Sequence, residues 1–249
     1  MRHLSLVVLP LFATACVFPN YKASKVVEYT LPADQITRLQ CDSHNGDITV
    51  TGVPGATEIA VRAELSVRGT SQSEADSNLH LMEVVRDTKG DLLHVFGRHP
   101  TGSLNNRSPN YRFVLKVPTA MAMALESHNG DIVTTGMVGT VKLETHNGDI
   151  QGQARTNHVT ALSHNGDVNL RIDGEGPLDG EITTHNGDID LALAESLGTR
   201  LEASTHNGRV SPPAKLYDAA ISRRKLSCSI GDGKGRLVVD THNGDVVVR

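Results

Sequence analysis

The sequence has no tryptophan and only four tyrosines and four phenylalanines. Proteins that bind sugars or nucleobases commonly place them on aromatic rings, so this composition weighs against an aromatic binding platform. Basic residues are not in excess either, because 24 Lys and Arg stand against 28 Asp and Glu, for a net charge of −4 with His neutral. No overall positive field therefore favours nucleic acid as a partner, and we expect none.

The apolar run Leu4–Phe12 is too short to span a bilayer. It follows Arg2 and precedes small residues that end at Cys16, which is the arrangement of a secretory signal. The ending resembles a bacterial lipobox, which implies cleavage before Cys16 and acylation of its thiol. Ordinary cleavage that leaves Cys16 unmodified is the alternative. We expect residues 1–15 to be a lipoprotein signal peptide and residues 16–24 to be a linker.

The localisation follows from this N-terminus. Residue 17 is Val rather than Asp, so the retention signal of inner-membrane lipoproteins is missing. In a Gram-negative host we expect an exported protein, held at the outer membrane by its lipid and facing the periplasm or the surface. The other two cysteines, Cys41 and Cys228, lie far apart in the sequence. Export permits a disulfide, but its geometry needs close Cα atoms, and we expect two buried free thiols instead.

A pentapeptide, Ser/Thr-His-Asn-Gly-Asp, occurs six times in the chain. The copies begin at Ser43, Ser127, Thr145, Ser163, Thr184 and Thr241. A seventh copy at Thr205 has Arg209 in place of the Asp, and residues 228–232 resemble a decayed eighth copy. From residue 128 onward the first four intervals between successive copies are 18, 18, 21 and 21 residues. Such self-similarity predicts a repeat architecture.

Apolar residues stand three and five positions before the His and four after it, with polar residues between them. Alternation with period two predicts half-buried strands on both sides of an Asn-Gly turn. The Ser or Thr then points inward, while His and Asp point outward. We expect positive φ angles at Asn and Gly to form the turn.

The fold class is predicted to be all-β, a β-solenoid of rungs of about 18–21 residues, because repeats of this length suit stacked rungs. An antiparallel meander is the alternative, since Asn-Gly also favours hairpins. In the solenoid the motifs stack about 4.8 Å apart and form ladders of His, Asn and Asp.

Residues 53–120 lack the motif and form an insertion in a single domain that spans residues 25–249, with regular repeats over 121–249. Strands are predicted over 57–67, 83–86, 92–96 and 111–117, a short helix over 71–82, a turn over 87–90 and an exposed loop over 102–110. We expect this strand-rich insertion to widen or cap the N-terminal end, because terminal rungs need protected edges.

Repeated Ser/Thr-x-x-Gly-Asp-Ile units after a stretch that ends in Val117-Pro118 resemble the DUF4097 family of β-strand-repeat proteins, which are often labelled "putative adhesins". The resemblance covers most of residues 25–249. It implies an exported or envelope-associated β-solenoid with no established enzyme activity.

The aligned His and Asp side chains form a candidate metal site. Imidazoles on neighbouring rungs, with the carboxylates three residues on, suit Zn²⁺, Cu²⁺ or Ni²⁺ better than Ca²⁺. The candidate ligands are His128, His146, His164, His185, His206, Asp131, Asp149, Asp167 and Asp188. The alternative is structural: His and Asp pair across the turn, and duplication copies the whole unit. On that interpretation no cofactor is expected.

Protonation gives the column a third potential role. Stacked imidazoles would repel one another when protonated, so the array would loosen at mild acidity. We expect no catalytic residues, because no unique nucleophile stands beside the repeated His and Asp. The sequence therefore favours a non-enzymatic, lipid-anchored binding or structural module, with a metal-binding envelope protein as the alternative. A β-helix enzyme acting on polysaccharide is the least favoured of the three.

Overall fold

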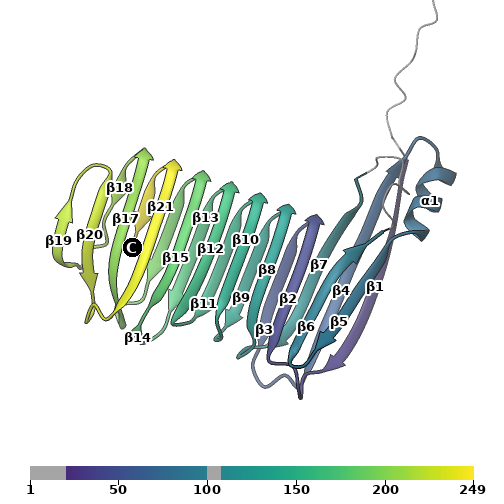
Figure 1. Cartoon of the computed structure of the whole chain (residues 1–249), viewed down its shortest axis with the longest axis horizontal. Coiled ribbons are helices and arrows are strands. Elements are labelled where there is room, and N and C mark those ends of the chain that lie inside the picture. The colour runs from purple at the N-terminus through teal and green to yellow at the C-terminus, as the bar shows by residue number, and fades with distance from the viewer. Residues whose placement is uncertain (1–20, 100–107) are drawn as a thin grey trace, which may run out of the picture.

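The computed structural model describes residues 21–99 and 108–249, so the predicted signal peptide, Cys16 and part of the predicted loop lie outside the described residues. Two long sheets, of ten and twelve strands, face each other along the molecule (Figure 1). Each rung gives one strand to each sheet, and neighbouring rungs pair in parallel, which confirms the solenoid and excludes the meander.

Seven rungs carry the motif. In spatial order they are β2 (Arg38–Asn45) with β3 (Ile48–Val53), β8 (Ala122–Asn129) with β9 (Ile132–Met137), β10 (Val141–Asn147) with β11 (Ile150–Arg155), β12 (His158–Asn165) with β13 (Val168–Asp173), β15 (Asp179–Asn186) with β16 (Ile189–Leu193), β21 (Gly235–Asn243) with β22 (Val246–Val248), and β17 (Leu197–Asn207) with β18 (Val210–Ser211). The two-residue strand β14 (Gly176–Pro177) pairs with β17.

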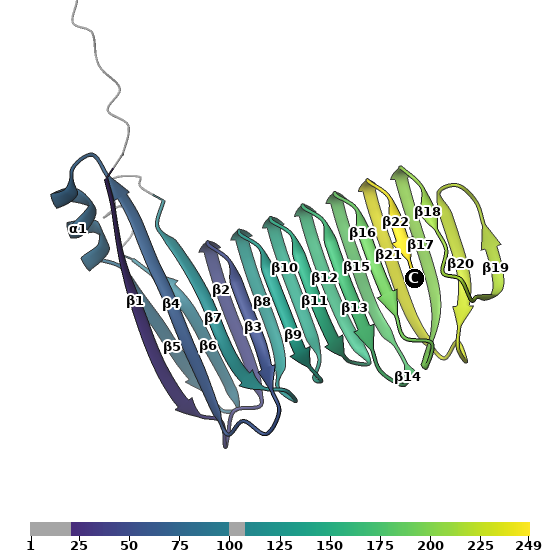
Figure 2. The same cartoon turned by 180° about the vertical axis from the view of Figure 1, so that it is seen from behind.

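The spatial order of the rungs differs from their order in the sequence. The last rung of the chain, β21 and β22, is inserted between the β15 rung and the β17 rung. Figure 2 shows β21 and β22 lying inside the stack, before its outer end. The rung of β17 and β18 is therefore the last one in space.

The N-terminal end is built from antiparallel strands and one helix. These are β1 (Tyr21–Pro32), β4 (Glu58–Gly69), α1 (Gln72–His80), β5 (Glu83–Lys89), β6 (Leu92–Arg98) and β7 (Asn110–Pro118). β7 stacks on β3 and β6 stacks on β2, so residues 53–120 extend both sheets beyond the first rung. β1 begins at Tyr21, inside the stretch predicted to be a linker, because its inward side chains join the core.

At the C-terminal end the twelve-stranded sheet closes with β20 (Lys225–Ile230) and β19 (Tyr217–Ile221). β20 pairs antiparallel with β17 and places Cys228 opposite Leu201. The interpretation of residues 228–232 as a decayed motif was therefore wrong, because the strand runs in the opposite direction to the rungs.

One continuous apolar core fills the space between the two sheets. Inward residues of every rung belong to it, as the alternation predicted, and the motif hydroxyls are buried at its margin. Cys41 and Cys228 are both buried and unpaired, as expected, and burial raises the pKa of each thiol. No helix in the described part of the chain is both long and apolar enough to cross a membrane.

Candidate functional site

The motif forms one corner of every rung, and its hydroxyl is used by the fold. Thr184 Oγ1, for example, donates to the backbone oxygen of Gly166 on the neighbouring rung, at 2.9 Å. The same bond recurs in all seven rungs, and at the N-terminal end Ser43 donates to the backbone oxygen of Tyr111. This inward hydroxyl thus joins neighbouring rungs.

The Asn side chains form a continuous amide ladder. Asn165 Nδ2 donates to Asn147 Oδ1 at 2.8 Å, and Asn186 Nδ2 donates to Asn165 Oδ1 at 2.8 Å. The pattern runs from Asn45 to Asn207, with Asn45 Nδ2 donating to the backbone oxygen of Pro109 at its start. Each amide supplies a donor and an acceptor, so the ladder continues for as long as rungs follow.

The Asp carboxylates accept hydrogen bonds from the backbone of the following rung. Asp167 Oδ1 accepts from the N–H of Asp188 at 2.8 Å, and the same contact links each pair of neighbouring rungs. A charged acceptor strengthens such a bond. Asp131, Asp149, Asp167 and Asp188 therefore already serve the fold.

Close packing explains the Gly better than its dihedral angle does. A Cβ atom on Gly187 would lie well inside 3.0 Å of the backbone oxygen of Gly166, and the motif glycines of the other rungs are equally crowded. Positive φ occurs at only three of them, Gly46, Gly166 and Gly244, and at none of the motif Asn residues. The expectation of positive φ at both turn residues was therefore wrong.

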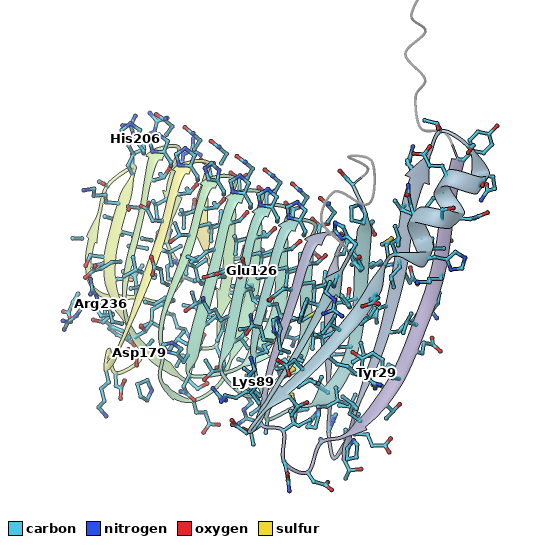
Figure 3. The ribbon with its side chains drawn as sticks, turned by 45° about the vertical axis from the view of Figure 1, so that its right-hand side comes forward. Tyr29, Lys89, Glu126, Asp179, His206 and Arg236 are labelled. Carbon is cyan, nitrogen blue, oxygen red and sulfur yellow. The ribbon has the colours of Figure 1, made fainter. Side chains whose placement is uncertain are left out.

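The imidazoles form a ladder of their own along one exposed edge. We call this set the histidine ladder; in spatial order it comprises His44, His128, His146, His164, His185, His242 and His206. Neighbouring ring centroids lie 4.6–5.0 Å apart. Figure 3 shows His206 at one end of this edge. Among the described residues, no hydrogen bond holds a ladder imidazole, so His is the one motif residue that the rungs do not use for hydrogen bonding.

The structure does not bring the His and Asp columns together. No ion pair joins a ladder His to a motif Asp anywhere in residues 21–99 and 108–249. The His stands near the end of one strand, whereas the Asp follows the Asn-Gly corner, just before the strand of the other sheet. Over the same residues, no group of three or more His, Cys, Asp or Glu side chains converges closely enough to hold a metal ion. The proposed pairing of His and Asp across the turn is likewise not formed.

A different set of carboxylates borders the histidine ladder, two residues before the His on the same strand. Glu126 and Glu144 are register partners on β8 and β10. With His128, His146 and His164 they line a groove of about 310 Å³. The sequence shows these residues as outward polar positions, and their spacing of two from the His places them on its face.

The two carboxylates have different partners. Glu144 is paired with Lys142 Nζ at 2.9 Å, whereas Glu126 forms no ion pair or hydrogen bond within the described chain but also raises the pKa of the Lys142 ammonium through its charge. Figure 3 shows Glu126 on the strands of this sheet, below the upper edge. The acids that stand two residues before the His in other rungs already have partners. Asp42 contacts His94 Nε2 at 2.6 Å, and the Asp240 carboxylate accepts a hydrogen bond from the Ser204 hydroxyl.

An eighth imidazole, His99, lies near the N-terminal end of the ladder. Its Nδ1 is 3.3 Å from the Tyr111 hydroxyl. Burial lowers the pKa of His99, and the nearby His44 lowers it further. This residue lies outside the motif, so the repeat gave no signal for it.

The molecule is thus a parallel β-solenoid whose corners are joined by side-chain ladders. The family profile of Toastrack DUF4097 matches residues 11–249, and the chain belongs to this family. No curated protein matches the sequence.

Solved structures that are similar to this chain include three bacterial proteins. One, described as a "putative cell adhesion protein" from Clostridium sporogenes, is 12% identical with a TM-score of 0.48, covering 91% of this chain and 99% of that one. A "putative adhesin" from Bacteroides fragilis is 11% identical with a TM-score of 0.35, covering 90% and 97%. A "putative lipid binding protein" from Parabacteroides distasonis is 11% identical with a TM-score of 0.33, covering 92% and 98%.

Proposed function

We propose that the protein is a non-enzymatic binding module of the cell envelope, anchored by lipid at Cys16, which presents the histidine ladder on a rigid edge. The observation that carries this proposal is the division of labour within the motif. Ser/Thr, Asn, Gly and Asp join one rung to the next, while the imidazole is exposed and makes no hydrogen bond among the described residues.

Two further features support a binding role. The ladder imidazoles are spaced regularly along one edge, which suits contact with an extended or repetitive surface. The motif carboxylates accept hydrogen bonds from backbone N–H groups, which leaves them poorly suited to proton transfer. Family membership agrees with a β-repeat module.

Anchoring is tested by labelling with palmitate and by fractionation. The natural chain should incorporate label and sediment with membranes, whereas Cys16→Ser should be unlabelled and soluble. A natural chain that takes up no label would refute the anchor.

Binding is tested with the soluble Cys16→Ser protein on isolated envelope fragments. A variant that also replaces His128, His146 and His164 by Gln should lose binding. The matched control replaces Thr49, Gln151 and Asn169, which are outward residues of the other sheet, by Ala, and it should bind normally. Equal binding by both variants would exclude the ladder as the binding surface.

A further inference from the structure

We infer that the C-terminal end of the solenoid is a docking surface for the phosphate headgroups of an anionic membrane. The surface, which we call the C-terminal basic cluster, comprises Arg209, Arg223, Arg224 and Lys225. These residues are not part of the histidine ladder, so the inference goes beyond the proposed function and does not depend on it.

The motif column that holds Asp in the earlier rungs holds Arg at its end. In successive places along the stack, the N–H of the residue four positions after the His donates to the backbone oxygen of Asp245, then of Arg209, and then of Arg223. Arg223 belongs to a turn, but its carbonyl stands where the next rung would place that of its motif acid. The charge of the column therefore changes from negative to positive over its last two places.

The other two cations follow in the same turn, which joins β19 to β20. The backbone oxygen of Arg224 accepts from the N–H of Thr205 at 3.0 Å, and Lys225 is the register partner of Ser204 on β17. Figure 2 shows this turn beside the ends of β17 and β18, at the edge where the motif corners lie. All four basic side chains are exposed there.

The charges of the cluster are not neutralised by direct contacts. Within residues 21–99 and 108–249, none of the four basic side chains forms an ion pair or a side-chain hydrogen bond. The acids on the neighbouring strands have other partners. Glu202 pairs with Arg236, the Asp240 carboxylate accepts from a Ser204 hydroxyl, and Asp245 accepts from the backbone N–H of Arg209. Four cations are therefore available to an anionic partner.

The kind of anion follows from the chemistry and shape of this end. Guanidinium groups bind phosphate through paired N–H donors and stay charged at any physiological pH. Clusters of about four to eight Lys and Arg at a surface are typical of binding to anionic lipids. The cations lie on an exposed turn, which suits a plane of headgroups better than one enclosed ion. Ile221, just before the turn, is 55% exposed and provides an apolar side chain for the membrane interface.

The position of the cluster gives membrane contact a defined consequence. The cluster lies at the end of the solenoid opposite to β1 (Figure 1). Docking through it therefore holds the molecule by the end farthest from its N-terminal strands.

The test is sedimentation of soluble Cys16→Ser protein with vesicles of phosphatidylglycerol and phosphatidylcholine, and with vesicles of phosphatidylcholine alone. We expect binding to the first kind only. Binding should weaken as NaCl rises from about 0.1 M to 1 M, because the Debye length falls from about 10 Å to 3 Å.

The variant Arg223→Gln with Arg224→Gln should bind these vesicles about 25-fold more weakly, because each cation near an anionic membrane contributes about fivefold. It should still fold, since the turn contacts the last corner through backbone oxygens that the substitutions keep. The matched control is Lys116→Gln with Arg171→Gln, which removes the same charge from exposed positions on the ten-stranded sheet and should bind normally. Thermal melts of both variants check that the fold is intact.

Four results would overturn the inference. The first is no binding of the folded natural sequence to the anionic vesicles, and the second is equal binding to phosphatidylcholine alone. The third is a loss in the control as large as that in the cluster variant, which would make net charge, and not the cluster, the cause of binding. The fourth is displacement by millimolar inorganic phosphate at constant ionic strength, which would make a free phosphate ion the ligand. The vesicles contain no other envelope component, so envelope binding that depends on the ladder imidazoles would still leave the proposed function standing.

Discussion

The Asp245 carboxylate accepts a hydrogen bond from the backbone N–H of Arg209 at 2.8 Å, and within the described part of the chain no further rung stacks beyond Arg209. In each rung from Asp131 to Asp245 the residue at this position makes two contacts, because its N–H donates to the preceding rung and its carboxylate accepts from the next one. The last rung needs only the backbone N–H donor, which any residue other than proline supplies. The replacement of Asp by Arg at position 209 therefore marks the end of the stack.

This relationship predicts that the same carboxylate matters inside the stack and not at its end. Asp167→Ala removes the acceptor for the N–H of Asp188 and should cost about 0.5–1.5 kcal/mol. Asp167→Asn keeps an acceptor oxygen and removes a charge from a column of like charges, so its stability should match or exceed that of the natural chain. Arg209→Asp should change stability by less than about 0.5 kcal/mol. Urea unfolding midpoints measure all three, and equal losses at positions 167 and 209 would contradict the argument.

The close approach of the rungs makes the motif glycines the most sensitive positions. A Cβ atom at Gly187 meets the backbone oxygen of Gly166 and forces the two rungs apart. The overpacking costs about 1–3 kcal/mol, and each hydrogen bond broken on either side adds about 1 kcal/mol. Gly187→Ala should therefore lose about 3 kcal/mol or more.

Gly90 is the matched control, because it has φ of +61° but open space around its Cα. Gly90→Ala should lose only the left-handed strain, about 1–2 kcal/mol. Thermal melts measure both variants. A lower melting temperature for Gly90→Ala than for Gly187→Ala would show that backbone strain, and not the spacing of the rungs, is the reason for glycine at these positions.

Much of the fold was predictable from the spacing of the motif. Period-two alternation placed Ile132 and Leu125 inward, and repetition at 18–21 residues predicted parallel rungs. The order of the rungs was not predictable from spacing, because every rung presents the same register. Asn243 pairs equally well with Asn186 on one side and Asn207 on the other. The one signal of the order was Arg209, whose meaning depends on knowing that the Asp serves the following rung.

The candidate site was predictable only in part. The histidine ladder follows from repetition, but the carboxylates that border it, Glu126 and Glu144, do not. His128 lies on β8 and Asp131 follows the Asn-Gly corner, just before β9 of the other sheet, so a separation of three residues places the two side chains on opposite sides of the corner. A separation of two along one strand leaves Glu126 beside His128.

Lowered pH should destabilise the protein through His99. Because burial and His44 lower its pKa below the ordinary value of 6.5, the folded state takes up this proton less readily than the unfolded chain. The contribution of His99 to the free energy of unfolding is therefore fully present above pH 6.5, and it is lost as the pH falls through the pKa of His99 in the folded state.

Melting temperatures at pH 7.5 and pH 5 measure this effect. The natural chain should melt lower at pH 5, and His99→Asn should narrow the difference between the two pH values. An acidic residue, Glu83, lines the same hollow as His99 and Arg98, so Glu83→Gln serves as the control. If the difference in melting temperature between pH 7.5 and pH 5 is the same in His99→Asn as in the natural chain, His99 is not its cause. If the natural chain melts identically at both pH values, the predicted pH dependence does not exist.

The insertion of the last rung predicts how the chain depends on its C-terminus. β21 and β22 separate the β15 rung from the β17 rung and pair in parallel with both, so removal of residues 235–249 leaves a slot inside the stack. Because each rung contacts mainly its neighbours, the rungs before the slot should remain folded, while β17–β20 keep only the short pairing of β17 with β14. Limited proteolysis of this truncated chain should cut within residues 197–230 and spare residues 122–193. A synthetic peptide of residues 235–249 should restore protection from proteolysis, because the β15 and β17 rungs on either side of the slot still offer the strands with which it pairs. Full protection without the peptide would mean that β17 stacks directly on β15, and that the inserted rung is dispensable.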